Sequence, residues 1–280
     1  MREIHTDEII KNVRAMCIEA NLALAEDVKK RILAAGETET SALGKRILGQ
    51  LEQNLAIAGE DQIPICQDTG MAVVFLNIGQ DVHIEGMPVE EAVNEGIRQG
   101  YRDGYLRKSV VGDPLLRENT GDNTPGIIHY SIVPGEAVEI TMAPKGFGSE
   151  NMSRIIMLKP ADGVEGVKNA VLETVKLAGP NACPPMVVGV GIGGDFEKCA
   201  ILAKKALTRN LDEPSPFPHI RRLEEELLKE INETGIGPGG LGGKTTALGL
   251  NIEIWPTHIA GLPVAVNICC HVNRHVRRVL

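Results

Sequence analysis

The sequence predicts a mixed α/β fold, one large domain of residues 1–280 in which helices surround mixed sheets. Two kinds of apolar pattern predict it. Long stretches with apolar residues three and four positions apart are typical of helices, and short apolar runs bounded by Gly and Pro are typical of strands. These patterns alternate along the chain with no repeat, low-complexity tract or convincing linker between them, so one domain is the simplest organisation.

Helices are predicted where one face is apolar and a preceding Pro or a following Gly marks an end. The predicted helices are 6–35 (one or two helices, closed by Gly36), 39–58, 88–105, 163–178, 195–208 and 219–234. The pattern is clearest in 39–58, which Gly59 is expected to end. Its apolar stripe consists of Leu43, Ile47, Leu48, Leu51 and Leu55.

Strands are predicted where short apolar runs lie between these helices. They are 71–78, 126–133, 136–142, 154–159, 186–190, 247–254 and 262–268. Residues 126–142 are expected to form a β-hairpin that turns at Pro134-Gly135, because Val138, Ile140 and Met142 alternate with polar residues after the turn.

Composition and charge restrict the classes of partner. Hydrophobic residues make up 43% of the chain and charged residues 24%, which is ordinary for a globular protein. The net charge of −8 makes nucleic acid or an anionic membrane a poor partner, although clustered Arg and Lys can still bind an anionic substrate. The N-terminus has no apolar signal segment, and no apolar run reaches the ~18–20 residues that span a bilayer. A cytoplasmic protein is expected.

The six cysteines fall into two groups, and reduced thiols are expected for such a chain. Cys17 and Cys199 lie on apolar helical stripes and are interpreted as small core residues. The other four lie at breaks in the pattern, next to Pro, Gly or His. These are Cys66, Cys183, Cys269 and Cys270. A thiol in such a loop is placed to bind a ligand.

Two Gly-rich stretches resemble nucleotide-binding loops, but neither fits. Residues 189–194 satisfy Gly-x-Gly-x-x-Gly between a strand and a helix, yet residues 207–218 contain no second strand that ends in an acidic residue. Residues 238–245 lack the first glycine of a phosphate-binding loop, because Pro238 stands there and has no N–H. The second stretch is interpreted either as a backbone loop that closes near a carboxylate or as tight turns.

Polar loops contain the candidate chemistry. Pro64 and Gly70 frame a turn that carries a thiol, an amide and a carboxylate in the order Cys66-Gln67-Asp68. Residues 107–109, 119–125 and 145–151 add cations, carboxamides and backbone amides, which suit the binding of carboxylates. Each segment taken alone is equally consistent with a solvated turn held by Asx hydrogen bonds.

Together these segments resemble the alpha subunit, or alpha region, of class I iron–sulfur fumarases and tartrate dehydratases. The resemblance covers essentially the whole chain. The motifs that carry it are residues 64–70, 119–125, 145–151, 183–185 with the glycines that follow, and 256–271. It implies a hydro-lyase of the fumarate hydratase class, for the reversible hydration of fumarate to L-malate. L-Tartrate or another 2-hydroxydicarboxylate is the alternative substrate, and a non-catalytic binding protein with the same fold is the second alternative.

The resemblance also implies a 4Fe–4S cluster held by three cysteines, with one iron left open to act as a Lewis acid on the substrate hydroxyl. By motif these ligands are Cys66, Cys183 and Cys270. Cys270 is preferred to Cys269 because the family's cysteine directly precedes a His. The separations of 117 residues (66 to 183) and 87 residues (183 to 270) contain no local ligand pair, so a zinc ribbon is unsupported.

Roles for polar residues follow from the same resemblance. Asp68 is the candidate that exchanges a proton with the substrate hydroxyl, with His258 as its partner or donor. The candidate ligands of the substrate carboxylates are Gln67, Arg107, Lys145, Gly146, Gly148 and Ser149. The alternatives are that Asp68 is a helix N-cap and that His258 is a hydrogen-bonded core histidine.

A partner chain is also expected from the resemblance. Single-chain members of the family continue past the last cysteine into a region that bears the catalytic base and further arginines. This sequence ends at Leu280, ten residues after Cys270. A separate beta subunit is therefore expected to supply the base, in an α2β2 assembly, and the chain alone is expected to be inactive.

Overall fold

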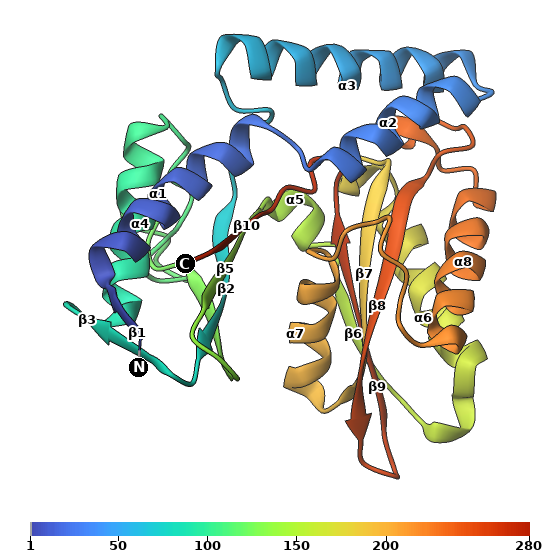
Figure 1. Ribbon diagram of the computed structural model, residues 1–280. Helices are drawn as coiled ribbons and strands as arrows, with labels where there is room; N and C mark the ends of the chain where they lie inside the picture. The colour runs from blue at the N-terminus through green and yellow to red at the C-terminus, as the bar shows by residue number, and fades with distance from the viewer. Residues whose placement is uncertain (1) are drawn as a thin grey trace. The chain divides into compact units, whose positions relative to one another are not determined.

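The computed structural model describes residues 2–280 and confirms the mixed α/β class (Figure 1). The described chain forms two compact units. Unit 1 comprises residues 2–25, 55–147 and 274–280, and unit 2 comprises residues 26–54 and 148–273. Each unit has its own sheet and its own apolar core. The single domain over residues 1–280 stays a prediction.

Unit 1 contains a four-stranded sheet in the order β10-β5-β2-β4, covered on one face by two helices (Figure 1). The helices are α1 (Thr6–Leu22) and α4 (Val89–Asp103), and the strands are β2 (Met71–Gly79), β4 (Ile127–Val133), β5 (Val138–Lys145) and β10 (Val276–Val279). A separate parallel pair joins β1 (Arg2–His5) to β3 (Val82–Glu85). Alternate residues of β2 and β5 pack against α1 and α4, which forms the core of this unit.

The predicted hairpin of residues 126–142 is wrong in its pairing, although both strands exist. β4 pairs in parallel with β2, and β5 pairs antiparallel with the other edge of β2, so β2 separates the two. The reason is the composition of β2, which is a continuous apolar run that suits the centre of a sheet better than an edge.

Unit 2 contains the sheet β6-β9-β7-β8, with α7 on one face and α6 and α8 on the other (Figure 1). The helices are α6 (Gly163–Ala178), α7 (Phe196–Ala206) and α8 (Pro218–Glu233). The strands are β6 (Arg154–Leu158), β7 (Met186–Gly194), β8 (Ala247–Thr257) and β9 (Leu262–Cys269). Short 3-10 segments are η1 (Pro160–Asp162), η2 (Gly179–Ala182) and η3 (Pro238–Gly240).

The glycines of residues 189–194 allow helix α7 to approach the sheet. Val188 and Val190 of β7 point into the core with α6 and α8, while Gly189 and Gly191 face α7. A Cβ at Gly189 would lie 2.2 Å from the carbonyl oxygen of Ala203, and one at Gly191 would lie 2.0 Å from that of Cys199. The motif lies inside a strand and serves packing, which agrees with the rejection of a dinucleotide site.

Some helix ends differ from the prediction. Helix α2 (Glu26–Thr38) continues through Gly36, and α3 (Ala42–Asp61) continues through Gly59. Neither glycine has a positive φ, so neither adopts the left-handed conformation that ends a helix. Cys17 and Cys199 are fully buried, which confirms their interpretation as core residues. Within residues 2–280 no helix is both long and apolar enough to cross a bilayer.

Candidate active site

The turn of residues 66–70, which precedes β2 in unit 1, is held in place by hydrogen bonds from three directions. The hydroxyl of Tyr101, on α4, lies 3.0 Å from the carbonyl oxygen of Thr69 and 2.9 Å from that of Gly70. The carboxamide of Asn123 donates to the carbonyl of Gly70 at 3.2 Å. The Thr69 hydroxyl accepts the N–H of Arg107 at 2.9 Å. The turn therefore presents its first three side chains from a fixed backbone.

Asp68 has both of its carboxylate oxygens engaged by backbone N–H groups. Oδ1 accepts from Gly70 at 3.0 Å, and Oδ2 accepts from Phe147 at 2.9 Å. Each carboxylate oxygen has a second acceptor position, so this half-buried group can still receive a proton or a further hydrogen bond. No helix follows Asp68, since β2 begins at Met71, so the alternative of an N-cap to its own helix is wrong.

The predicted carboxylate ligands of unit 1 gather around the same turn. Arg107 and Gln67 are both exposed, and the guanidinium donates to the Gln67 amide oxygen at 2.7 Å. Lys145 is buried at the end of β5, and its ammonium donates to the carbonyl of Gly146 at 3.0 Å. A Cβ at Gly146 would lie 3.1 Å from Oδ2 of Asp68, so only glycine leaves this side of the carboxylate open.

Sequence reasoning missed Arg274, which is 3% exposed and lies outside the family motifs. Its Nη2 donates to the backbone carbonyl of Asp68 at 2.6 Å, and its Nε donates to that of Pro144 at 3.2 Å. Tyr101 was missed as well, because on its helix it is simply part of the apolar face. Asn123 lies in the polar segment of residues 119–125, but nothing in the sequence indicates that it contacts the turn.

Unit 2 brings Cys183 and Cys270 to the same end of its sheet. Cys183 follows η2 and precedes β7, while Cys270 directly follows β9, which runs antiparallel to β7 with Val187 opposite Cys269. Nδ1 of His271 lies 3.1 Å from the backbone oxygen of Cys183, so the two segments are in contact. Cys183 is exposed and Cys270 is half-buried, whereas Cys269 is buried. This exposure favours Cys270 over Cys269 as a ligand.

His258 lies at the opposite end of the same sheet. β8 runs parallel to β7, so the turn after β8 lies beyond the last residues of β7, whereas Cys183 precedes its first. The nine residues of β7 span roughly 30 Å. Within unit 2 His258 is therefore not brought to the two cysteines. Its ring is exposed and accepts the N–H of Ala260 at 3.1 Å, so it is not a core histidine.

Gly148 and Ser149 follow Phe147 in the short helix α5 (Phe147–Glu150) and are counted in unit 2. Ser149 is buried, and its carbonyl accepts the N–H of Met152 at 3.1 Å. A Cβ at Gly148 would meet no atom within 4 Å. The backbone at Gly148 is therefore open to a ligand, whereas the Ser149 side chain is enclosed.

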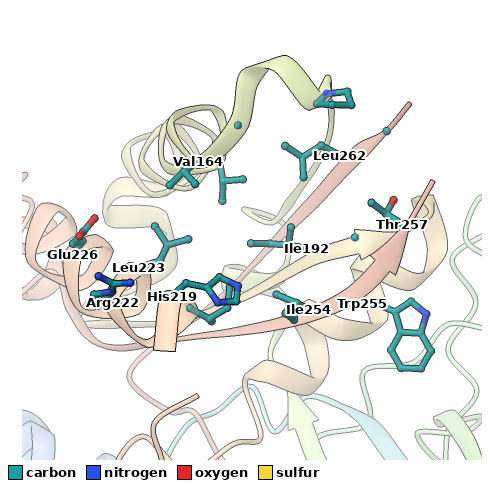
Figure 2. Close-up of a pocket in the computed structure, with 16 residues that line it drawn as sticks. Val164, Ile192, His219, Arg222, Leu223, Glu226, Ile254, Trp255, Thr257 and Leu262 are labelled. Carbon is teal, nitrogen blue, oxygen red and sulfur yellow. The ribbon is translucent and has the colours of Figure 1, made fainter. Parts of the chain in front are cut away.

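A cavity of about 620 Å³ in unit 2 lies at the same end of the sheet as His258 (Figure 2). Apolar residues dominate its wall, and Val164, Ile192, Leu223, Ile254 and Leu262 line it. His219, Arg222 and Glu226 of α8 stand together along one side (Figure 2). None of the predicted site residues lines this cavity.

The predicted ligand set fits a thiolate-bound cluster in the chemistry of its donors. Cys66, Cys183 and Cys270 are thiols that are not buried and lie at breaks between elements, whereas burial raises the pKa of both core thiols, Cys17 and Cys199. Across residues 2–280 no three His, Cys, Asp or Glu side chains are grouped within metal-binding reach. Cys66 belongs to unit 1, and the other two belong to unit 2.

Comparison with known proteins identifies the family. Residues 10–279 match the family described as fumarate hydratase (Fumerase). The chain is 46% identical to a Methanocaldococcus jannaschii protein provisionally named L(+)-tartrate dehydratase subunit alpha, over 91% of this chain and 92% of that one. It is 32% identical to the L(+)-tartrate dehydratase subunit alpha of Escherichia coli (strain UTI89 / UPEC), over 95% and 88%. The chain therefore belongs to the fumarate hydratase (Fumerase) family of hydro-lyases, in which its relatives are named as alpha subunits.

Proposed function

We propose that this chain is the alpha subunit of an iron–sulfur hydro-lyase for a four-carbon dicarboxylate, with the hydration of fumarate to L-malate as the first candidate reaction. The observation that carries the proposal is the turn of residues 66–70. It combines an accessible thiol, a fixed carboxylate and an exposed amide that is bonded to an arginine. Such a set supports binding of both a metal cluster and a carboxylate substrate.

Cys66, Cys183 and Cys270 would hold a 4Fe–4S cluster as thiolates. When bound, a cluster with one iron lacking a protein ligand supplies a Lewis acid for the substrate hydroxyl. Cys183 is exposed and Cys66 and Cys270 are half-buried, whereas Cys17 and Cys199 are fully buried, which supports this choice of ligands. Contact between His271 and the Cys183 backbone supports a shared role for the two segments in unit 2.

Arg107, with Gln67, would bind one substrate carboxylate. The guanidinium is exposed and donates one N–H to Gln67. Its other N–H groups remain available for a bidentate contact with the carboxylate. The Lys145–Gly146 segment and the open backbone at Gly148 would bind the second carboxylate. Ser149 is the less favoured of the predicted donors, because its side chain is enclosed. Fixed donors aimed at a carboxylate also stabilise the charge that builds there as the neighbouring carbon loses its proton.

Asp68 would exchange a proton with the substrate hydroxyl. Its two N–H donors hold the carboxylate in one orientation, with a lone pair on each oxygen left for the substrate. The role of His258 as the partner of Asp68 stays a prediction. The pH dependence of turnover in a His258→Asn variant would test it. The base for the carbon acid and further arginines would come from a separate beta subunit. The names of the relatives, which are alpha subunits, support such a partner.

L(+)-Tartrate is the second candidate substrate, because both relatives are named L(+)-tartrate dehydratase subunit alpha, the first of them provisionally. Coexpression with a beta partner, anaerobic reconstitution with iron and sulfide, and initial rates with fumarate, L-malate and L(+)-tartrate test the proposal. Turnover of one of these acids that requires both iron and the partner is expected. Iron-loaded complex that is inactive on all three acids would contradict the hydro-lyase activity. Turnover by the chain alone would contradict the need for a partner.

A further inference from the structure

Glu39, in the connection between α2 and α3, is a buried carboxylate bound by four backbone N–H groups. It is 1% exposed. Oε1 accepts from Thr40 at 2.8 Å and from Ser41 at 3.0 Å. Lys244 donates to both oxygens, at 2.9 and 3.0 Å, and Thr245 donates to Oε2 at 2.9 Å. The Gly-rich loop of residues 235–243 is thus followed directly by two N–H groups that bind an internal carboxylate.

The same Gly-rich loop contacts the segment around Cys183. The N–H of Gly239 donates to the carbonyl of Pro184 at 2.8 Å, and a Cβ at Gly240 would lie 2.5 Å from Cβ of Pro180. Directly after the loop, the carbonyl of Thr246 accepts the N–H of Met186 at 2.8 Å. The residues on both sides of Cys183 therefore rest on a loop whose end is fastened by Glu39.

Cys183 needs such support because its own backbone is strained. Its φ of 51° lies in the left-handed region, which costs free energy for a residue with a side chain. Within its own segment, the N–H of Cys183 donates a hydrogen bond to the carbonyl oxygen of Pro180 at 3.1 Å. A conformation of this kind persists when the surrounding structure holds it, and the contacts of the Gly-rich loop provide that hold.

We propose that Glu39 is a positioning residue for the Cys183 thiolate: it fixes the Gly-rich loop, and the loop fixes the backbone from which Cys183 points. This inference rests on the proposed role of Cys183 as a cluster ligand. The fit around the carboxylate is close, since a Cβ at Gly243 would lie 2.9 Å from Oε1 of Glu39. A neutral amide in its place would turn N–H donors toward the N–H groups of Lys244 and Thr245, so the negative charge is required.

The test compares Glu39→Gln with Asp27→Asn in the full-length chain and in its reconstituted complex. Asp27 is a matched control, because it is a buried carboxylate of α2 whose hydrogen bond is to the backbone N–H of Leu211, at 2.6 Å, and so to a segment other than the Gly-rich loop. Hydrogen exchange is measured on peptides that cover residues 178–187 and 236–246. Loss of bound iron to a chelator is measured on the complex, and circular dichroism checks the fold.

Exchange at least about tenfold faster in both peptides is expected for Glu39→Gln, since it leaves buried N–H groups without their acceptor. Iron loss is expected to be about tenfold faster as well, and Asp27→Asn is expected to change neither. Unchanged exchange in Glu39→Gln, or the same change in Asp27→Asn, overturns the positioning role. Faster exchange with unchanged iron loss overturns the link to the Cys183 ligand. A wild-type complex without iron refutes the cluster itself, while exchange still decides whether Glu39 holds the loop.

Discussion

The backbone carbonyl of Asp68 accepts a hydrogen bond from Nη2 of Arg274 at 2.6 Å, although 206 positions of sequence separate them. Nε of the same guanidinium donates to Pro144 at 3.2 Å, just before the Lys145–Gly146 segment. One buried arginine therefore ties the turn that carries Cys66 and Asp68 to the end of β5. Unit 1 places these candidate site residues together largely through bonds to main-chain groups, with the contact between Arg107 and Gln67 as a direct bond between two candidate ligands.

Arg274→Lys is expected to lower the free energy of unfolding by about 1–3 kcal/mol, because a single ammonium cannot reproduce the two directed N–H bonds of the guanidinium. Turnover of the complex is expected to fall with it. Arg277→Lys is the matched control, since Arg277 is exposed and pairs with Glu139 at the surface. A change within about 0.5 kcal/mol is expected there. Chemical denaturation of both variants measures the difference. Equal losses of stability in the two variants would contradict the role of Arg274 in holding the turn.

Asp68→Asn is expected to lower kcat by about 10²–10⁴-fold, the range for loss of a general acid–base group. An amide in this place also turns one N–H toward the donors of Gly70 or Phe147. Steady-state rates are therefore measured together with bound iron and circular dichroism. Retained iron with low kcat is the expected result. Wild-type kcat would exclude Asp68 from the chemistry.

Most elements could be predicted from sequence because their apolar periodicity is strong. Helix α6 begins and ends at the predicted residues, and β2, β6 and β9 agree to within one residue. The partner of a strand was harder to predict, since apolar alternation in 126–142 indicates strands but not which neighbour each one bonds. Strands β1, β3 and β10 were not predicted, because they are four residues each and contain charged or polar side chains.

The candidate site could be predicted only where a motif is local. The turn of residues 66–70 is one segment, so its thiol, amide and carboxylate were visible together. Arg274 donates hydrogen bonds to main-chain carbonyls that are far from it in the sequence, and such contacts have no sequence signature. Glu39 could not be predicted for a different reason. An acidic residue between two helices is usually exposed, and the burial of Glu39 depends on the N–H groups of residues 244 and 245.

Gly189→Ala is expected to lower the free energy of unfolding by about 1–3 kcal/mol, or more, because the added methyl group would lie 2.2 Å from the carbonyl oxygen of Ala203 and α7 would have to move. Gly36→Ala is the control. Gly36 lies within helix α2 with nothing within 4 Å of the added carbon, so a gain of about 0.5–1 kcal/mol is expected. Urea denaturation measures both variants. A tolerated Gly189→Ala would contradict the close packing of α7 on β7.

The stability of the chain is expected to fall in acid through Glu39. Burial works to raise the pKa of this carboxyl, but the N–H groups of residues 40, 41, 244 and 245 outweigh it and lower the pKa from 4.5 to about 2. The folded state thus binds the proton more weakly than the unfolded state. The contribution, roughly 3 kcal/mol, is complete above pH 4.5 and is lost as the pH falls toward 2. Denaturation at several pH values measures this effect. The free energy of unfolding should fall less steeply with falling pH in Glu39→Gln than in the wild type, and an identical slope would contradict this.

Iron content of cysteine variants tests the central claim, that three thiolates from distant parts of the chain hold one cluster. The reconstituted complex is compared with its Cys66→Ser, Cys183→Ser and Cys270→Ser variants, and Cys269→Ser and Cys199→Ser serve as controls. A full 4Fe–4S complement is expected in the wild type and both controls, and a clear loss of iron is expected in each of the first three. A wild-type complex without iron, or an undiminished complement in any of those three, would contradict the account.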